Sequence, residues 1–262
     1  MRCISSNEPS IRPRESYRRQ HGVDVPNASR KVVIVTGASQ GIGAGVAEGF
    51  RGAGYAVVGA SRSISSSDAA DFLTVRGDIA EVETAQTIVK QAVNRFGRID
   101  SLINNAGIFI SKPFTDYTLE DYLAITAVNL TAFFHITQGV IRQMLAQGTG
   151  GHIVNVTTSL VDHAESENPS ALVSLTKGGL AAVTRSLAIE YASRGVRFNA
   201  VALGVIENPV YDPASYDGLA QLHPLGRVGQ ISDVVEGILY LERASFVTGV
   251  VLHIDGGQSA GD

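Results

Sequence analysis

Short apolar runs alternate with longer helical patterns through most of this chain, and this alternation restricts the fold more than any other feature. The runs are apolar at consecutive positions, which indicates strands buried on both faces. They cover residues 31–36, 55–60, 72–76, 99–104, 152–157, 196–201 and 250–254. Helical patterns separate them at residues 44–53, 82–96, 119–147, 169–194 and 231–241. The alternation predicts an α/β fold of the Rossmann type, a doubly wound parallel sheet of about seven strands with helices on both faces.

Residues 1–29 differ from the rest of the chain. They are rich in arginine, contain few apolar residues and show no periodicity. The apolar segment of a secretory signal is missing from them, and their acidic residues are untypical of a transit peptide. We expect a mobile N-terminal tail here, with a functional arm as the less favoured alternative. No internal repeat or linker interrupts residues 30–262, which are predicted to form a single domain.

The composition argues against several classes of function. The net charge at pH 7 is −4 and there is no basic patch, so a nucleic-acid partner is not expected. The single cysteine, Cys3, cannot form a disulfide within one chain, and the six histidines lack the spacing of metal ligands. No apolar run approaches the roughly 18 residues that a membrane span needs. We therefore expect a cytoplasmic protein without a metal site or a membrane partner.

A glycine-rich segment at residues 36–43, Thr-Gly-Ala-Ser-Gln-Gly-Ile-Gly, connects the first predicted strand to the first predicted helix. Glycines allow a tight turn there and let the backbone approach a pyrophosphate. The helix N-terminus adds free N–H groups and the positive end of its dipole. A position between a buried strand and a helix is the context that such a motif requires. The residues predicted to bind a dinucleotide here are Gly37, Ser39, Gln40, Gly41, Ile42 and Gly43.

The end of the second predicted strand bears on which dinucleotide is bound. Folds that bind NAD usually place an acidic residue there, which holds the ribose 2′-hydroxyl. This chain has Ser61 and Arg62 instead. The serine can hydrogen-bond a 2′-phosphate and the arginine can pair with it, so NADP is favoured over NAD. The alternative is an ordinary surface arginine.

Further motifs follow the glycine loop in a fixed order along the chain. They are Asp78-Ile79, Asn104-Asn105-Ala106-Gly107, Asn129, Lys177, Thr248-Gly249 and Asp255-Gly256-Gly257. Together with the glycine loop, they closely resemble the short-chain dehydrogenase/reductase family over residues 31–257. For the adenosine side, the resemblance implies that Asp78 hydrogen-bonds the adenine amine and that Ile79 packs nearby. Asn105 would line the cleft, and Ala106 and Gly107 would leave room for the cofactor.

On the nicotinamide side, the resemblance implies that Asn129 holds a backbone kink and a water of a proton relay. Lys177 would bind the nicotinamide ribose. Thr158 takes the place of the family's serine, with Ser159 beside it, and a threonine hydroxyl can donate to a substrate carbonyl. Gly204 and Ile206 would contact the cofactor, although the proline and threonine that the family commonly has in this segment are replaced.

Val173 departs from the family's pattern. It stands four residues before Lys177, where the family has a tyrosine that protonates the developing alkoxide. General acid catalysis of this kind contributes roughly 10²–10⁴-fold to the rate, and valine has no proton to give. Ser174 would point off that helix face, and Ser170, one turn earlier, is a poor acid without assistance.

Two other segments contain groups that could replace the tyrosine. His163 could act as the acid, oriented by Asp162 or Glu165, although a solvated polar loop is the favoured interpretation. Tyr211 or Tyr216 could supply a phenol from a lid over residues 208–223, although aromatic packing is the favoured use of these side chains.

The sequence therefore favours an NADP-dependent oxidoreductase that acts on a small carbonyl or alcohol substrate with a non-standard proton donor. The alternative is a catalytically silent NADP-binding sensor or assembly subunit, and lyase or isomerase chemistry is a minor third option. The resemblance also implies a homo-dimer or homo-tetramer that pairs the helices over residues 119–147 and 170–194.

Overall fold

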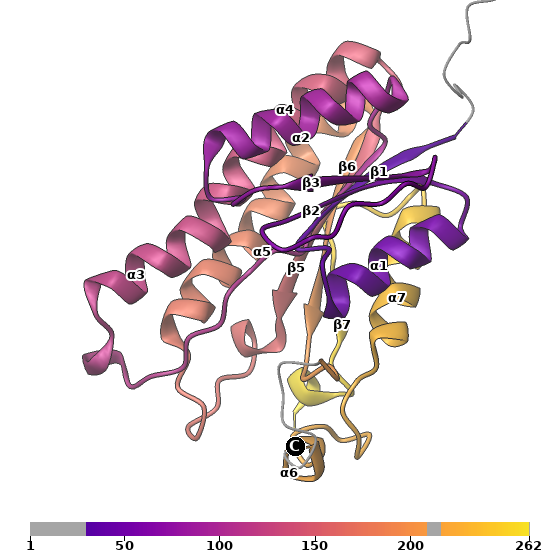
Figure 1. Ribbon diagram of the computed structural model, residues 1–262. Coiled ribbons are helices and arrows are strands. Elements are labelled where there is room, and N and C mark those ends of the chain that lie inside the picture. The colour runs from indigo at the N-terminus through magenta and orange to yellow at the C-terminus, as the bar shows by residue number, and fades with distance from the viewer. Residues whose placement is uncertain (1–29, 209–215, 262) are drawn as a thin grey trace, which may run out of the picture.

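A parallel sheet of seven strands forms the centre of the protein (Figure 1). The computed structural model describes residues 30–208 and 216–261, so the predicted tail and Tyr211 lie outside the described residues. The strands are β1 (Val32–Thr36), β2 (Ala56–Ser61), β3 (Phe72–Arg76), β4 (Ser101–Asn104), β5 (Gly151–Thr158), β6 (Val196–Leu203) and β7 (Val251–Ile254). Their spatial order is β3-β2-β1-β4-β5-β6-β7 and every pair is parallel. The predicted fold class is confirmed.

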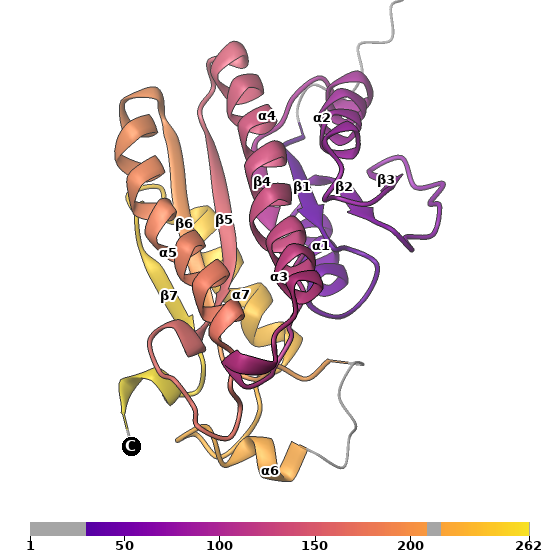
Figure 2. The same ribbon diagram turned by 90° about the vertical axis from the view of Figure 1, so that its left-hand side faces the viewer.

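Helices cover both faces of the sheet. Helices α1 (Gly41–Gly52) and α7 (Ile231–Arg243) lie on one face, and α2 (Val82–Phe96), α4 (Ala132–Gln147) and α5 (Ala171–Tyr191) lie on the other (Figures 1 and 2). Successive side chains of each strand point to opposite faces of the sheet, so each helical layer packs on its own apolar core. Two shorter helices, α3 (Leu119–Thr126) and α6 (Tyr216–Ala220), lie beyond the sheet.

Helices α1 and α7 are in unusually close contact. A methyl group added at Gly45 would overlap the side chain of Ile231, and one added at Gly49 would overlap Val235. The glycines therefore let the two helix backbones approach along about one turn of each helix. Because α1 begins in the glycine loop, this contact also fixes the position of that loop relative to α7.

The single helix predicted over residues 119–147 is interrupted. A capping box at Thr118 begins α3, and a π-helical turn over Ala127–Thr131 joins it to α4. The stretch Leu119–Gln147 has the length and hydropathy, 1.3 on average, of a membrane-spanning helix. Its most apolar window is 39% buried, and its second half, α4, packs on α2 and β4.

The strand order places one crevice at the carboxyl edge of the sheet. From β1 the chain runs outward through β2 and β3, and then returns to form β4 on the other side of β1. At such a reversal the loops after the two central strands diverge, which opens a ligand-sized crevice. The glycine loop follows β1 and the Asn105–Gly107 segment follows β4, so both predicted motifs border the crevice.

Candidate active site

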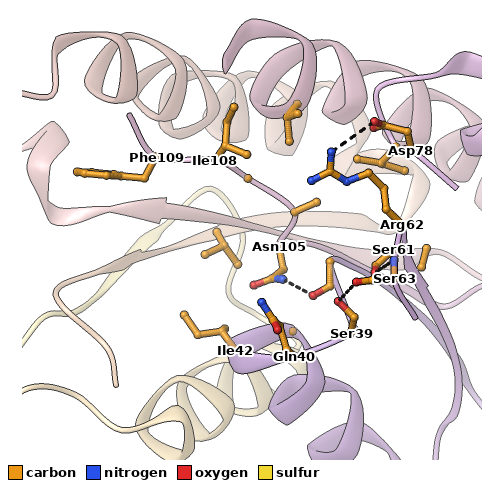
Figure 3. A pocket seen from close by; sticks show the side chains of 18 of the residues that line it. Ser39, Gln40, Ile42, Ser61, Arg62, Ser63, Asp78, Asn105, Ile108 and Phe109 are labelled. Carbon is orange, nitrogen blue, oxygen red and sulfur yellow. Dashed lines mark hydrogen bonds and ion pairs between the residues drawn. The ribbon is translucent and has the colours of Figure 1, made fainter. Parts of the chain in front are cut away.

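The glycine loop is held in place by the segment after β4. Asn105 donates from Nδ2 to the carbonyl oxygens of Thr36 and Gly37, at 2.9 and 3.3 Å (Figure 3). In return, Thr36 Oγ1 accepts from the backbone N–H groups of Asn105 and Ala106, at 3.1 and 3.0 Å. The asparagine predicted to line the cleft therefore also joins β1 to β4.

Three glycines are required by the geometry of this loop. Gly37 and Gly41 have φ of +69° and +55°, a conformation that side chains with a Cβ rarely adopt. A Cβ on Gly43 would overlap the Gly37 carbonyl oxygen and would approach the Asn105 amide to 2.6 Å. The loop thus leaves a bare backbone concavity at the start of α1, which fits a phosphate group.

A cavity of about 450 Å³ opens beside this loop. Predicted site residues from six different segments line it: Gly37, Ser39, Gln40, Ile42, Gly43, Ser61, Arg62, Asp78, Ile79, Asn105, Ala106, Gly107, Thr158 and Lys177. The remaining predicted cofactor residues, Gly41, Gly204 and Ile206, do not line it. A crevice of this size, with a glycine cradle in its middle and polar groups at both ends, fits a dinucleotide.

Hydroxyl groups and one cation gather at the end of β2. Ser63, which the sequence analysis missed, donates from Oγ to Ser39 at 3.3 Å, and its N–H donates to Ser61 Oγ at 3.1 Å. Arg62 lies 3.9 Å from Asp78, with 75% of its side chain exposed (Figure 3). These groups can reorient toward a ligand, because each is solvent-accessible and held by one or two weak contacts.

Lys177 lies at the opposite end of the cavity. Its side chain is 8% exposed, and Nζ donates to the carbonyl oxygen of Val156 at 2.8 Å. Burial lowers the pKa of this amine to about 8. A Cβ on Gly107 would lie 2.9 Å from Nζ, so the glycine after β4 makes room for the lysine.

Asn129 occupies the π-helical turn between α3 and α4 and is 1% exposed. Oδ1 accepts from Ile108 N–H at 2.9 Å, and Nδ2 donates to the Ile108 carbonyl and to Thr176 Oγ1, both at 3.2 Å. The predicted distortion of the helix is present. The side chain ties the loop after β4 to α5, and it does not line the cavity.

Val173 and Thr158 lie beside Lys177 along the cavity wall. Val173 is 2% exposed and packs with Ile125 and Leu172 in a small apolar cluster. Thr158 ends β5, and its hydroxyl accepts from Leu160 N–H at 3.3 Å. That contact leaves the hydroxyl proton of Thr158 available to donate into the cavity.

Two tentative catalytic residues are not brought to the cavity. Ser159 is 1% exposed and donates to Gln258 at 2.7 Å and to the Leu203 carbonyl. His163 lies in the loop beyond it and does not line the cavity. The acids expected to orient this histidine have other partners, since Asp162 pairs with His253 at 2.9 Å and Glu165 accepts from Gln258.

The segment after β6 differs from the prediction. A Cβ on Gly204 would lie 2.6 Å from His223 Nε2 and 2.9 Å from the Asp255 backbone, so this glycine serves packing. Ile206 is 4% exposed, in the core beside α1 and α7. Asn208 lines the cavity in their place. The Tyr216 hydroxyl exchanges hydrogen bonds with the Asn208 backbone at 3.1 and 3.2 Å, and Tyr216 does not line the cavity.

Comparisons with known proteins agree with this geometry. A family model described as enoyl-(acyl carrier protein) reductase matches residues 37–259. Glucose 1-dehydrogenase of Gluconobacter oxydans (strain 621H) is 33% identical over 245 residues, which cover 87% of this chain and 91% of that protein. Among solved structures, ElxO with NADP bound has a TM-score of 0.82 at 29% identity, covering 88% of this chain and 100% of that one. The 3-ketoacyl-(acyl-carrier-protein) reductase from Brucella melitensis, complexed with NADH, has a TM-score of 0.80 at 30% identity, covering 87% and 98%. The chain therefore belongs to the short-chain dehydrogenase/reductase family of NAD(P)-dependent oxidoreductases.

Proposed function

We propose that this protein is an NADP-dependent oxidoreductase that reduces a small carbonyl compound, or oxidises the corresponding alcohol, without a tyrosine as proton donor. One observation carries the proposal: a single cavity joins the glycine cradle to Lys177 and Thr158. A dinucleotide seated on the cradle would extend toward a cation and a hydroxyl, which is where a carbonyl oxygen needs polar partners.

The preference for NADP rests on the end of β2. Ser39, Ser61 and Ser63 place hydroxyl groups near one another, and Arg62 adds a cation there. A 2′-phosphate is an acceptor for all of these donors, and a guanidinium binds it in a bidentate manner. The solved relatives do not decide the matter, because ElxO was described with NADP and the Brucella enzyme with NADH.

The substrate class follows from the lining near Lys177. Ile108, Phe109, Val156 and Val173 contribute apolar surface to that end of the cavity. Among the described lining residues, the charged ones are Arg62 and Asp78 at the β2 end and Lys177 itself. An apolar wall with few polar groups binds an uncharged aliphatic or aromatic carbonyl compound better than a charged one.

The residues around the reacting carbon have separate tasks. A bound nicotinamide supplies or accepts the hydride. Thr158 donates from its hydroxyl to the substrate oxygen, and Lys177 holds the ribose hydroxyls with the donors that Val156 leaves available. Val173 stands where the family has its tyrosine and presents methyl groups to the same space.

A second candidate is a catalytically silent NADP-binding protein. The observation in its favour is the apolar cluster around Val173, which puts no acid where the family has one. Both candidates predict cofactor binding, so they differ only in whether the wild-type protein transfers a hydride.

The deciding experiment measures NADPH oxidation by the wild-type protein and by Val173→Tyr over a panel of ketones, aldehydes and quinones. The exposed residue Thr87 on α2, away from the cavity, provides a control, Thr87→Tyr, that should behave like the wild type. Turnover by the wild type supports the oxidoreductase. Turnover by Val173→Tyr alone, with NADPH bound by both proteins, supports the silent binding protein.

We also propose that α4 and α5 mediate self-association. Phe134 on α4 and Leu175 and Ile189 on α5 are 55%, 60% and 80% exposed, on the layer that faces the viewer in Figure 2. Exposed apolar side chains of this size on one layer are typical of a homo-oligomer interface. Light scattering of the wild type and of Ile189→Glu should show a dimer or tetramer that the substitution dissociates.

A further inference from the structure

We propose that Lys177 is itself the proton donor of the reaction, giving a proton from Nζ to the substrate oxygen directly or through one water. The inference rests on the oxidoreductase function proposed above and assigns the step that a valine at position 173 leaves open.

The first support is the position of Lys177 on α5. Val173 and Lys177 are four residues apart and therefore lie on the same face of the helix, one turn apart. Both line the cavity, together with Thr158 at the end of β5. A substrate oxygen that accepts from the Thr158 hydroxyl is thus placed beside Val173 and next to the lysine.

The second support is the space at position 173. Val173 and Lys177 line the same cavity, and the valine side chain is much smaller than an aromatic ring at that position would be. We infer that the substrate oxygen, or one water, occupies the space that the smaller side chain leaves within hydrogen-bond reach of Nζ. The apolar neighbours Ile108, Ile125 and Leu172 exclude further water and strengthen the interaction between ammonium and oxygen.

The third support is that the other described groups cannot serve. Arg62 and Asp78 face each other at the β2 end of the cavity. Ser159, His163 and Tyr216 do not line it. Thr158 can donate a hydrogen bond, but an unassisted hydroxyl is a poor acid near pH 7. Among the residues that the structure describes, this leaves Lys177 as the group that titrates at the reacting end.

The surroundings of Lys177 suit an acid that must also be regenerated. Its one hydrogen bond is to a backbone carbonyl, and no described carboxylate forms an ion pair with it. Burial lowers the pKa of the amine to about 8, close to neutral pH, which is where general acids work best. An ordinary solvated lysine, with a pKa near 10.4, would release its proton far less readily.

The proton and electron balance is simple. In reduction, the carbonyl carbon accepts a hydride from NADPH and the π pair moves to oxygen. The oxygen then takes a proton from the ammonium of Lys177, which leaves a neutral amine and an alcohol. Solvent that enters after product release returns a proton to Nζ. Alcohol oxidation runs through the same steps in reverse, with the neutral amine as base.

The test compares wild type, Lys177→Arg, Lys177→Met and the control Lys90→Arg, a substitution at an exposed site on α2. Arginine keeps the positive charge and the donors but does not release a proton near neutral pH. We expect Lys177→Arg to lower kcat at least 100-fold with the NADPH dissociation constant, measured by fluorescence titration, changed less than about fivefold. Lys90→Arg should match the wild type in both.

A second readout does not depend on turnover. Reductive methylation of the protein with ¹³C-formaldehyde labels its lysines, and NMR follows each amine as a function of pH. Apart from the N-terminal α-amine, which also titrates near pH 8, we expect one resonance to titrate near pH 8 and to be missing from Lys177→Met. For carbonyl reduction, kcat/KM should fall about tenfold per pH unit above that same pKa, because the neutral amine cannot donate.

The outcomes separate the two proposals. A wild type that turns over while Lys177→Arg retains more than a third of its kcat, or whose kcat/KM is flat through the titration of the amine, overturns this inference alone. A wild type without hydride transfer overturns the oxidoreductase function and the inference with it. If Lys177→Arg does not fold, the agreement between the amine titration and the wild-type rate profile decides.

Discussion

Buried polar groups at the two ends of the central strands differ in how many of their hydrogen bonds are made within the protein. At the amino edge, Glu242 at the end of α7 accepts from the Tyr55 hydroxyl at 2.8 Å, from Ser101 Oγ at 3.0 Å and from His152 Nδ1 at 2.7 Å. Asn199 Nδ2 donates to the other ring nitrogen of His152 at 3.0 Å. Each of these groups meets a partner from another strand or helix, so the edge is closed to solvent and to ligands.

The electrostatics of this network follow from its hydrogen bonds. Burial lowers the pKa of His152, and the ring accepts at Nε2, so the histidine is neutral. Burial opposes the ionisation of Glu242, but donors from His152, Tyr55 and Ser101 outweigh it and hold the carboxyl pKa below its ordinary value. Both groups bind fewer protons in the folded state than in the unfolded one. Stability is therefore lost as the pH falls below about 6.5, first through the histidine and then through the glutamate.

At the carboxyl edge the polar groups keep unused hydrogen-bonding capacity. Lys177 has three donor positions and makes one hydrogen bond within the described residues. Thr158 accepts one bond and retains its proton, and the serines near β2 hold each other only weakly. A buried polar group by itself therefore does not indicate a ligand-binding site. A polar group with unused hydrogen-bond donors or acceptors directed into a cavity does.

The largest expected effect on NADPH binding comes from the glycine loop at residues 36–43. Gly43→Ala places a methyl group on the Gly37 carbonyl, so we expect NADPH affinity to fall more than about 100-fold and stability to fall by about 1–3 kcal/mol or more. Gly52→Ala, at the other end of α1, has no atom within 4 Å of the added Cβ. It should bind NADPH normally and gain up to about 1 kcal/mol. Fluorescence titration and thermal unfolding measure both, and normal binding by Gly43→Ala would show that the loop can rearrange.

Substitutions of Glu242 at the amino edge should lower the stability of the protein and leave cofactor binding unchanged. Glu242→Ala removes the acceptor of three buried donors, and we expect a loss of about 3–5 kcal/mol in urea unfolding. Glu242→Gln keeps the shape and one acceptor, so it should cost less. The NADPH dissociation constant of the folded protein should be unchanged for both, since the network lies at the far edge from the cavity. A loss below about 1 kcal/mol would mean that water replaces the carboxylate.

In the cavity, by contrast, removing a buried charge should raise stability, because burying the ammonium of Lys177 costs free energy. The amine's pKa falls from 10.5 to about 8 on folding, so the folded state binds fewer protons between these values. The penalty is therefore full below pH 8 and disappears as the pH approaches 10.5. We expect Lys177→Met to be more stable than the wild type by up to about 3 kcal/mol at pH 7, with the difference vanishing near pH 10.5. Lys90→Met is the exposed control, and a pH-independent difference would contradict the assignment.

The smallest effect concerns the β2 end. Arg62 is largely exposed and is held by a single contact with Asp78, so Arg62→Ala should leave the melting temperature unchanged. Its affinity for NADPH should fall about tenfold and its affinity for NADH should change little. Arg76→Ala provides the control, because Arg76 is exposed nearby and donates from Nε to the Arg62 backbone. Equal losses for both cofactors would remove the case for NADP.

Much of this architecture was predictable from the sequence because it follows from local patterns. Strands that are apolar on both faces, and glycines between a strand and a helix, have few structural alternatives. The positions of β1, β2, β3 and the glycine loop therefore agree with the prediction, within about one residue at each boundary.

The misses lie where partners come from distant parts of the chain. Ser159 and Glu165 both hydrogen-bond Gln258, which lies about a hundred residues later in the chain. A local sequence pattern cannot predict such a contact. Gly204 faces His223 and Asp255 for the same reason. Ser63 was missed because it follows β2 in an irregular segment, where the direction of a side chain depends on tertiary contacts.

The glycine contacts between α1 and α7 have a mechanical consequence. Both helices start near the carboxyl edge, and the last turn of α7 places Glu242 inside the closed network of the amino edge. With Gly45 against Ile231 and Gly49 against Val235, short branched side chains of α7 pack directly on the bare backbone of α1. The pair acts as a strut that spans the sheet. The glycine loop at the start of α1 therefore keeps its position on the sheet through this packing against α7, whatever happens to the hydrogen bonds at the far end of the pair.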